Sequence, residues 1–128
     1  MKKITLIFTL LVSTVMLSSP SYAEWTKLGG PEGSGLYVDY ERIRKHGGYV
    51  YFWQLIDVLT PVKSEILSSK SYTKGDCKLF RYSNLSHSFH IEPMGLGTGD
   101  VREPAKKGWV YPPPNSIMET VLKSVCSR

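Results

Sequence analysis

The residues of this 128-residue chain best suited to covalent chemistry are its two cysteines, Cys77 and Cys126. Two thiols can form a disulfide, contribute to a metal site, or act singly as nucleophiles. A metal site usually draws on further cysteines or histidines at short spacing, which this isolated pair lacks. In an oxidising compartment the two thiols are expected to join, and a free nucleophilic thiol conflicts with that pairing. We therefore predict a disulfide between them.

The three histidines and the scattered acidic residues do not form a catalytic or metal-binding pattern. His87 and His90 would share one face of a helix, but on a strand they point to opposite faces. Their segment alternates like a strand, so we predict no shared metal. No Gly-x-Ser-x-Gly motif is present, and the glycines of residues 95–99 lack the spacing and the following helix of a phosphate loop. We expect neither enzymatic activity nor a cofactor.

The residues best suited to binding a partner are basic. The chain carries a formal charge of +5. This mild excess favours acidic surfaces without the concentrated charge of a nucleic-acid-binding protein. Such clusters are usually solvated faces, and the alternative is that they contact an acidic protein. The predicted partner-binding residues are Arg42, Arg44, Lys45, Lys106 and Lys107.

Residues 1–23 have the pattern of a secretory signal peptide. Lys2 and Lys3 precede an apolar run that is shorter than the ~20 residues of a spanning helix, and small residues lie just before Glu24. Cleavage there would leave residues 24–128 as one domain, whereas an uncleaved N-terminal anchor is the alternative. No cysteine follows the run to carry a lipid, so we expect no membrane anchor after cleavage and a periplasmic or secreted location.

The long apolar segment of residues 49–60 must organise the fold. It is apolar on both alternating faces, which predicts a central strand, and Pro61 is expected to end it. Asp57 is the odd residue of this strand, and marks either a buried acid or the strand's exit to solvent. Residues 64–73 and 77–91 are predicted to form a hairpin around a turn at 74–76.

The other elements follow from local patterns. Ser116 and Glu119 fit the capping box of a helix over residues 115–126. Its apolar face is predicted to comprise Ile117, Val121, Leu122 and Val125. Short strands are expected at 24–28 and 36–40, a short strand or an anchoring segment at 109–111, one helical turn or a polar strand at 41–46, and a mobile loop at 92–108. The prediction is an α+β fold: a single curved antiparallel sheet with a C-terminal helix packed across one face and tethered by the disulfide.

Short motifs along nearly the whole of residues 24–128 resemble the surface-adhesin protein E family. The most specific are Tyr37-Val38-Asp39, the strand segment ending in Trp53, Asp76-Cys77 and Val125-Cys126. The resemblance implies a six-stranded antiparallel sheet with a helix tied to its concave side by the disulfide, and a non-enzymatic role. The family's name-giving member is a dimeric outer-membrane lipoprotein that binds host matrix and serum proteins. This chain departs from it in lacking the lipid-anchoring cysteine.

The sequence thus predicts an exported bacterial binding protein of surface-adhesin E type. Its expected partners are host matrix or serum proteins, or envelope proteins, and it is expected to form a homodimer. The alternative is a periplasmic protein without an adhesive role, which binds a small ligand or an envelope component between the sheet and the helix. A pocket there lined by Trp53 or Trp109 would favour that alternative, and a filled groove would count against it.

Overall fold

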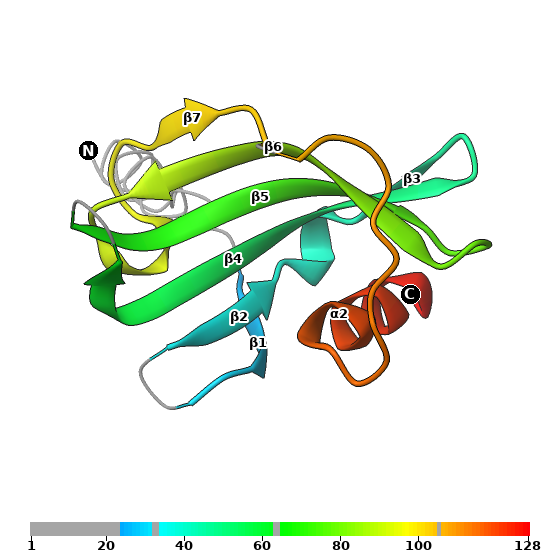
Figure 1. The fold of residues 1–128 in the computed structure, drawn as a ribbon, viewed down its shortest axis with the longest axis horizontal. Helices are drawn as coiled ribbons and strands as arrows, with labels where there is room; N and C mark the ends of the chain where they lie inside the picture. The colour runs from blue at the N-terminus through cyan, green and yellow to red at the C-terminus, as the bar shows by residue number, and fades with distance from the viewer. Residues whose placement is uncertain (1–23, 32–33, 63–64, 105) are drawn as a thin grey trace, which may run out of the picture.

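The computed structural model describes residues 24–31, 34–62, 65–104 and 106–128. The predicted signal peptide, residues 1–23, lies outside the described residues. The described chain forms an antiparallel sheet with one C-terminal α-helix, α2 (Figure 1). The elements are β1 (Thr26–Gly29), β2 (Gly35–Val38), β3 (Arg44–His46), β4 (Tyr49–Val62), β5 (Ile66–Asp76), β6 (Arg81–His90), β7 (Asp100–Arg102) and α2 (Ile117–Cys126).

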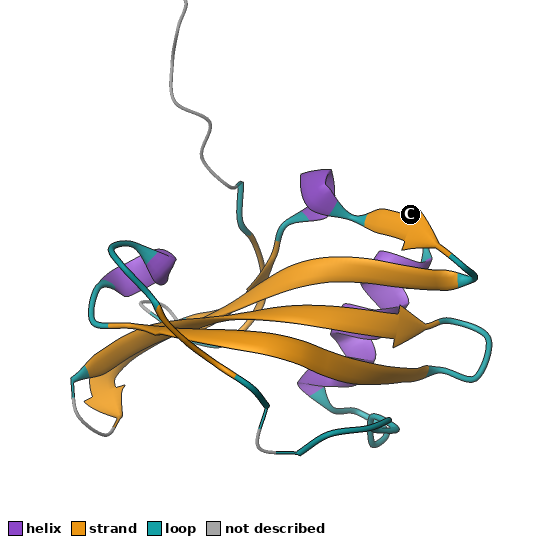
Figure 2. Ribbon diagram, turned by 90° about the horizontal axis from the view of Figure 1, so that it is seen from above, coloured by secondary structure: helices purple, strands orange, loops and turns teal. Residues whose placement is uncertain are grey.

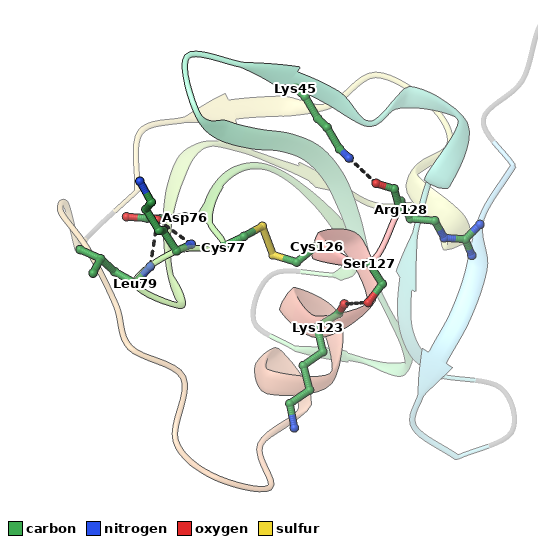
Figure 3. The surroundings of a disulfide bond; sticks show 9 residues. Lys45, Asp76, Cys77, Leu79, Lys123, Cys126, Ser127 and Arg128 are labelled. Carbon is green, nitrogen blue, oxygen red and sulfur yellow. Dashed lines mark hydrogen bonds between the residues drawn. A yellow bond between two sulfur atoms is a disulfide. The ribbon is translucent and has the colours of Figure 1, made fainter.

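The sheet follows the order β1-β2-β4-β5-β6-β7, with β3 paired to the start of β4. It has seven strands where the sequence predicted about six, and the predicted fold class is otherwise confirmed. The long strands curve around α2, which lies inside the curl (Figures 2 and 3). The short strand β7 was not predicted. Its three residues are all exposed, so they form no alternating pattern of burial.

Strand β4 is the predicted centre of the fold. It pairs with β2 and β3 on one side and with β5 on the other. Val50 and Phe52 point toward α2, and the alternate residues point to the far face. The prediction that Pro61 ends the strand is wrong, because β4 continues to Val62. The register shifts between Asp57 and Val62, and a proline is tolerated at such an irregularity because a ladder hydrogen bond is already missing there.

Helix α2 begins as predicted, at a serine cap. The Glu119 amide donates to Ser116 Oγ at 3.2 Å, which satisfies one of the free N–H groups of the first turn. Val121, Leu122 and Val125 are completely buried against the sheet, whereas Ile117 remains 43% exposed. Within the described segments, no helix has the length and apolar character needed to cross a bilayer.

The turn between β5 and β6 differs from the prediction. The expected turn at 74–76 is wrong, because β5 continues through Asp76 and the chain reverses at residues 77–80. Gly75 is in the strand for a packing reason. A Cβ atom there would lie 2.8 Å from Val50 Cγ1 and 3.0 Å from Leu122 Cδ1. The glycine therefore lets α2 approach the sheet. The turn was predicted at 74–76 because glycine usually favours turns over strand interiors.

The segment predicted as a mobile loop covers part of the sheet. A short 3-10 helix, η2 (Pro93–Gly95), contacts β4 and β5, and β7 pairs with β6. Asp57 is 8% exposed, and its Oδ1 accepts a hydrogen bond from the Met94 amide at 2.8 Å. Asp57 is therefore buried, and the interpretation that it marks the strand's exit to solvent is wrong.

Two further short elements settle open alternatives. Residues 41–46 contain both predicted options, since the 3-10 helix η1 (Tyr40–Arg42) is followed by strand β3. Of the two options for residues 109–111, the anchoring segment is the one found, since only a single bridge joins Val110 to Tyr82. That bridge nevertheless fixes Trp109 beside the start of β6.

Candidate functional site

The predicted disulfide is present and joins the β5–β6 turn to the end of α2 (Figure 3). Cys77 and Cys126 are 49 residues apart in sequence. Next to the bridge, Asp76 organises the turn: its Oδ1 accepts from the amides of Lys78 and Leu79, each at 3.1 Å. Hydrogen bonds lower the pKa of Asp76 below its usual value. The bond from the Leu79 amide has the largest effect, and Arg81 and the Lys78 amide add to it. The bridge is therefore anchored in a rigid turn.

The middle of the groove between sheet and helix is filled with apolar side chains. Phe52 and Val38 from the sheet, and Leu122 from the helix, have no exposed surface. They belong to one cluster that also contains Val121 and Val125. Of the two tryptophans expected to line this groove, Trp53 points away from it and Trp109 stacks near Tyr49, which also points away. The filled middle of the groove counts against a ligand bound there. At the disulfide end a hollow of about 400 Å³ remains, and its lining includes Lys45, Val50 and Cys126.

Aromatic side chains instead collect on the sheet face opposite α2. Side chains directly opposite each other in an antiparallel pair lie on the same face. Trp53 pairs with Tyr72, and Tyr51 pairs with Lys74. These four residues therefore lie on the face of the sheet opposite Val50 and Phe52. We define the aromatic face as the following residues: Tyr49, Tyr51, Trp53, Tyr72 and Trp109.

The rings of the aromatic face form a strip of two contacting groups, with Lys74 between them. Trp53 and Tyr72 have ring centroids 4.9 Å apart, and Tyr51 stacks on Tyr72 at 6.1 Å. Tyr49 lies 5.7 Å from Trp109. All five side chains are half-buried, so each ring keeps part of its surface open to solvent. Mutual stacking fixes the orientation of these rings before any partner arrives.

Cations are placed over and beside this strip. Lys74 Nζ lies 4.1 Å from the Tyr49 ring centroid, and the Arg81 guanidinium lies 4.2 Å from that of Trp109. Arg44 faces the same way because it pairs with Tyr51. A hydrogen bond to Asp76 raises the pKa of Arg81, so its charge is secure.

The carboxylates of the same face are hidden from solvent. Asp39, Asp57 and Asp76 are 1%, 8% and 5% exposed. Each is used internally: Asp39 accepts from the Glu41 amide, Asp57 from the Met94 amide, and Asp76 from the turn. The exposed part of the aromatic face is therefore both apolar and positively charged.

A small cavity adjoins the aromatic face at Trp53. Its volume is about 200 Å³. We call it the tryptophan pocket, and it is lined by Trp25, Asp39, Arg42, Trp53 and Lys70. Its walls come from four places in the sequence, namely the start of β1, the end of β2 with η1, the middle of β4 and the middle of β5.

The predicted basic residues do not form one cluster. Arg42 lines the tryptophan pocket, and Arg44 lies on the aromatic face. Lys45 pairs with Val50, so it points to the helix side, where its ammonium group donates to the Arg128 carbonyl (Figure 3). Lys106 and Lys107 are exposed in the segment after β7, and Lys107 forms an ion pair with Glu103 at 3.1 Å.

The histidines are placed as their strand predicts. His87 contacts Ser71 and His90 contacts Ser88, through hydrogen bonds of 2.6 and 2.8 Å on opposite faces of β6. His90 is 2% exposed, and burial, with the nearby Lys70 charge, lowers its pKa. In the part of the chain that the structure describes, no three His, Cys, Asp or Glu side chains are grouped to hold a metal ion.

Sequence reasoning did not identify the aromatic face. The alternation of Tyr49, Tyr51 and Trp53 was a visible signal that one side of β4 carries large rings. The contributions of Tyr72 and Trp109 depend on strand register and on the Val110 bridge, neither of which a sequence pattern specifies. The alternation of side chains along β4 could therefore be predicted from the sequence, but the aromatic face to which those side chains belong could not.

Comparisons with known proteins agree with this architecture. The profile of the family described as surface-adhesin protein E matches residues 25–127. Haemophilus influenzae protein E in one crystal form has a TM-score of 0.61 and 17% identity, covering 80% of this chain and 96% of that one. Protein E from non-typeable Haemophilus influenzae has a TM-score of 0.57 and 17% identity, covering 83% and 86%. No curated protein sequence matches the chain. The chain belongs to the surface-adhesin protein E family.

Proposed function

We propose that this protein is an exported, non-enzymatic binding protein that docks an acidic protein surface on its aromatic face. Membership of a surface-adhesin family supports an exported location and a binding role. The partner is proposed to be a host matrix or serum protein, or a protein of the bacterial envelope. Cleavage before Glu24, release into the periplasm or medium, and a homodimer belong to the same proposal.

One observation carries the proposal: rings and cations are exposed together on a face whose carboxylates are buried. Tyrosine, tryptophan and arginine are the residues that most often dominate protein–protein binding energy. Lys74 and Arg81 would attract an acidic partner and orient it, and the strip of rings would supply the desolvated contact. Arg42 and Arg44 extend the positive rim on the side of β3 and η1.

The test is binding of the exported protein to purified matrix and serum proteins in about 0.15 M salt, where exposed charges are already screened beyond about 8 Å. Tyr72→Ala and Lys74→Gln should each weaken saturable binding by about tenfold, in the range of interface hot spots. Lys123→Gln removes a 67% exposed cation from α2 and serves as the matched control. Absence of saturable binding, or equal loss in the control, would reject the proposal.

Lys106 and Lys107 remain proposed contacts from the sequence and need their own variant. The double change Lys106→Gln/Lys107→Gln should weaken binding only if the partner also reaches the segment after β7. Intact mass of the exported product tests the remaining parts. A product that begins at Glu24 and is lighter by the two hydrogen atoms lost on disulfide formation is the expected result.

A further inference from the structure

The tryptophan pocket has a composition suited to a small ligand. Two indole rings and two cationic side chains converge on a cavity of about 200 Å³. Drug-sized ligands usually occupy about 300–1,000 Å³, so this cavity fits a single ring or a short side chain. It stands apart from the groove between sheet and helix, whose middle is filled.

The buried acid of the pocket acts as a support for Arg42. Asp39 is 1% exposed, and its Oδ1 accepts the Glu41 amide at 3.1 Å, which fixes the start of η1. Its Oδ2 is buried without a hydrogen bond and lies 3.6 Å from Arg42 Nε. The charge of Asp39 thus draws the guanidinium over the pocket, while 49% of the Arg42 side chain stays exposed. A ligand meets Arg42 before it can meet Asp39.

The other walls are also held in place. Trp53 stacks on Tyr72 with ring centroids 4.9 Å apart. The stem of Lys70 runs along Gly95, because a Cβ atom built on that glycine would lie 3.0–3.1 Å from Lys70 Cδ and Cγ. Among the ion pairs of the described residues, none involves Lys70. Its ammonium group is therefore available to a ligand.

We infer that the tryptophan pocket binds a carboxylate carried on a flat ring or a short apolar group. The charge of the pocket is positive, because two cations outweigh one buried acid. A guanidinium matches a carboxylate through paired hydrogen bonds, and the two indoles provide apolar walls for the body that carries it. A cationic ligand is disfavoured, since the one carboxylate of the pocket is buried beneath Arg42. This site does not depend on the protein partner proposed above.

Two sources could supply that chemistry: a free aromatic acid, or the C-terminal carboxylate of a peptide ending in an aromatic residue. The probes are phenylacetate, its neutral analogue 2-phenylethanol, its cationic analogue phenethylamine, and a peptide ending in phenylalanine as free acid or as amide. The readout is the set of three indole N–H signals in nitrogen-15 NMR spectra of the exported protein, one for each tryptophan.

Phenylacetate should shift the Trp25 and Trp53 signals saturably and leave Trp109 unchanged, and the alcohol and the amine should bind at least about tenfold more weakly. Arg42→Gln and Lys70→Gln should each weaken phenylacetate by about tenfold, and Lys123→Gln should not. Tighter binding of the free-acid peptide than of phenylacetate assigns the source as a peptide terminus, and the reverse order assigns a free acid. No saturable shift up to about 10 mM of either acid, or equal binding of acid and alcohol, would overturn the inference.

Discussion

Opening the disulfide offers the sharpest test of how this small sheet is stabilised. The perturbation is the double change Cys77→Ser/Cys126→Ser, which leaves both positions with small side chains. The bridge spans 49 residues of sequence. Loop-closure entropy for a loop of that length gives a loss of about 4 kcal/mol of unfolding free energy. That is a large share of the roughly 5–15 kcal/mol by which domains are stable.

The helix should nevertheless remain docked in the double variant. Val121, Leu122 and Val125 are fully buried whether or not the bridge is closed, and burying each such side chain contributes about 1.5–3 kcal/mol. The variant should therefore fold with a native far-ultraviolet circular dichroism spectrum and unfold at lower denaturant. With a slope near 2 kcal/mol/M, the urea midpoint should fall by about 2 M.

Urea titration of oxidised wild type and the double variant, followed by circular dichroism and tryptophan fluorescence together, provides the assay. Wild type that has been reduced and alkylated is a second route to the same state. A loss below about 1 kcal/mol would show that the bridge does not constrain the unfolded chain as reasoned. Loss of helical signal without denaturant would show that the bridge, and not the apolar contact, holds α2.

Three further outcomes follow from named contacts. Gly75→Ala should cost about 1–3 kcal/mol in urea unfolding, because its methyl group meets Val50 and Leu122, and no loss would mean that α2 is not closely packed there. Asp57→Ala should cost about 1–3 kcal/mol by leaving the Met94 amide unpaired, whereas the exposed Asp100→Ala should change stability by less than about 0.5 kcal/mol. Burial lowers the pKa of His90, so the unfolded chain binds its proton more readily. Thermal stability should therefore fall as pH drops below about 6.5, and His90→Gln should flatten that slope.

The parts of the fold that the sequence predicted are those set by local or covalent chemistry. Ser116 and Glu119 define the start of α2 through bonds within one helical turn. The disulfide was predicted from the even number of cysteines and from the predicted signal peptide. The doubly apolar pattern of β4 identified the centre of the sheet, because one set of its side chains packs on α2 and the other set contributes to the aromatic face.

The errors arose where tertiary contacts override local preference. Gly75 has the composition of a turn, but it is in a strand because α2 approaches there. Asp76, read as part of the same turn, is the last residue of β5 and accepts the amides that form the real turn. Pro61 stays within β4 at a register shift that depends on pairing with β5. Each of these features is defined by a partner segment that is distant in sequence.

The candidate site was the least predictable part for the same reason. The five basic residues chosen from the sequence are divided by strand parity, so Arg44 and Lys45 point to opposite faces of the sheet. The aromatic face and the tryptophan pocket combine side chains from β1 through Trp109, and only the strand register brings them together. A single sequence carries no information on that register.

The central claim is that the partner binds the sheet face opposite α2. Oxidative footprinting of aromatic and sulfur side chains tests it directly, with the protein alone and bound to the tightest-binding matrix or serum protein. The account predicts that Tyr51, Tyr72 and Trp109 become protected on binding, while Met118 on α2 keeps its reactivity. Protection of Met118 with unchanged oxidation of the three rings would contradict it.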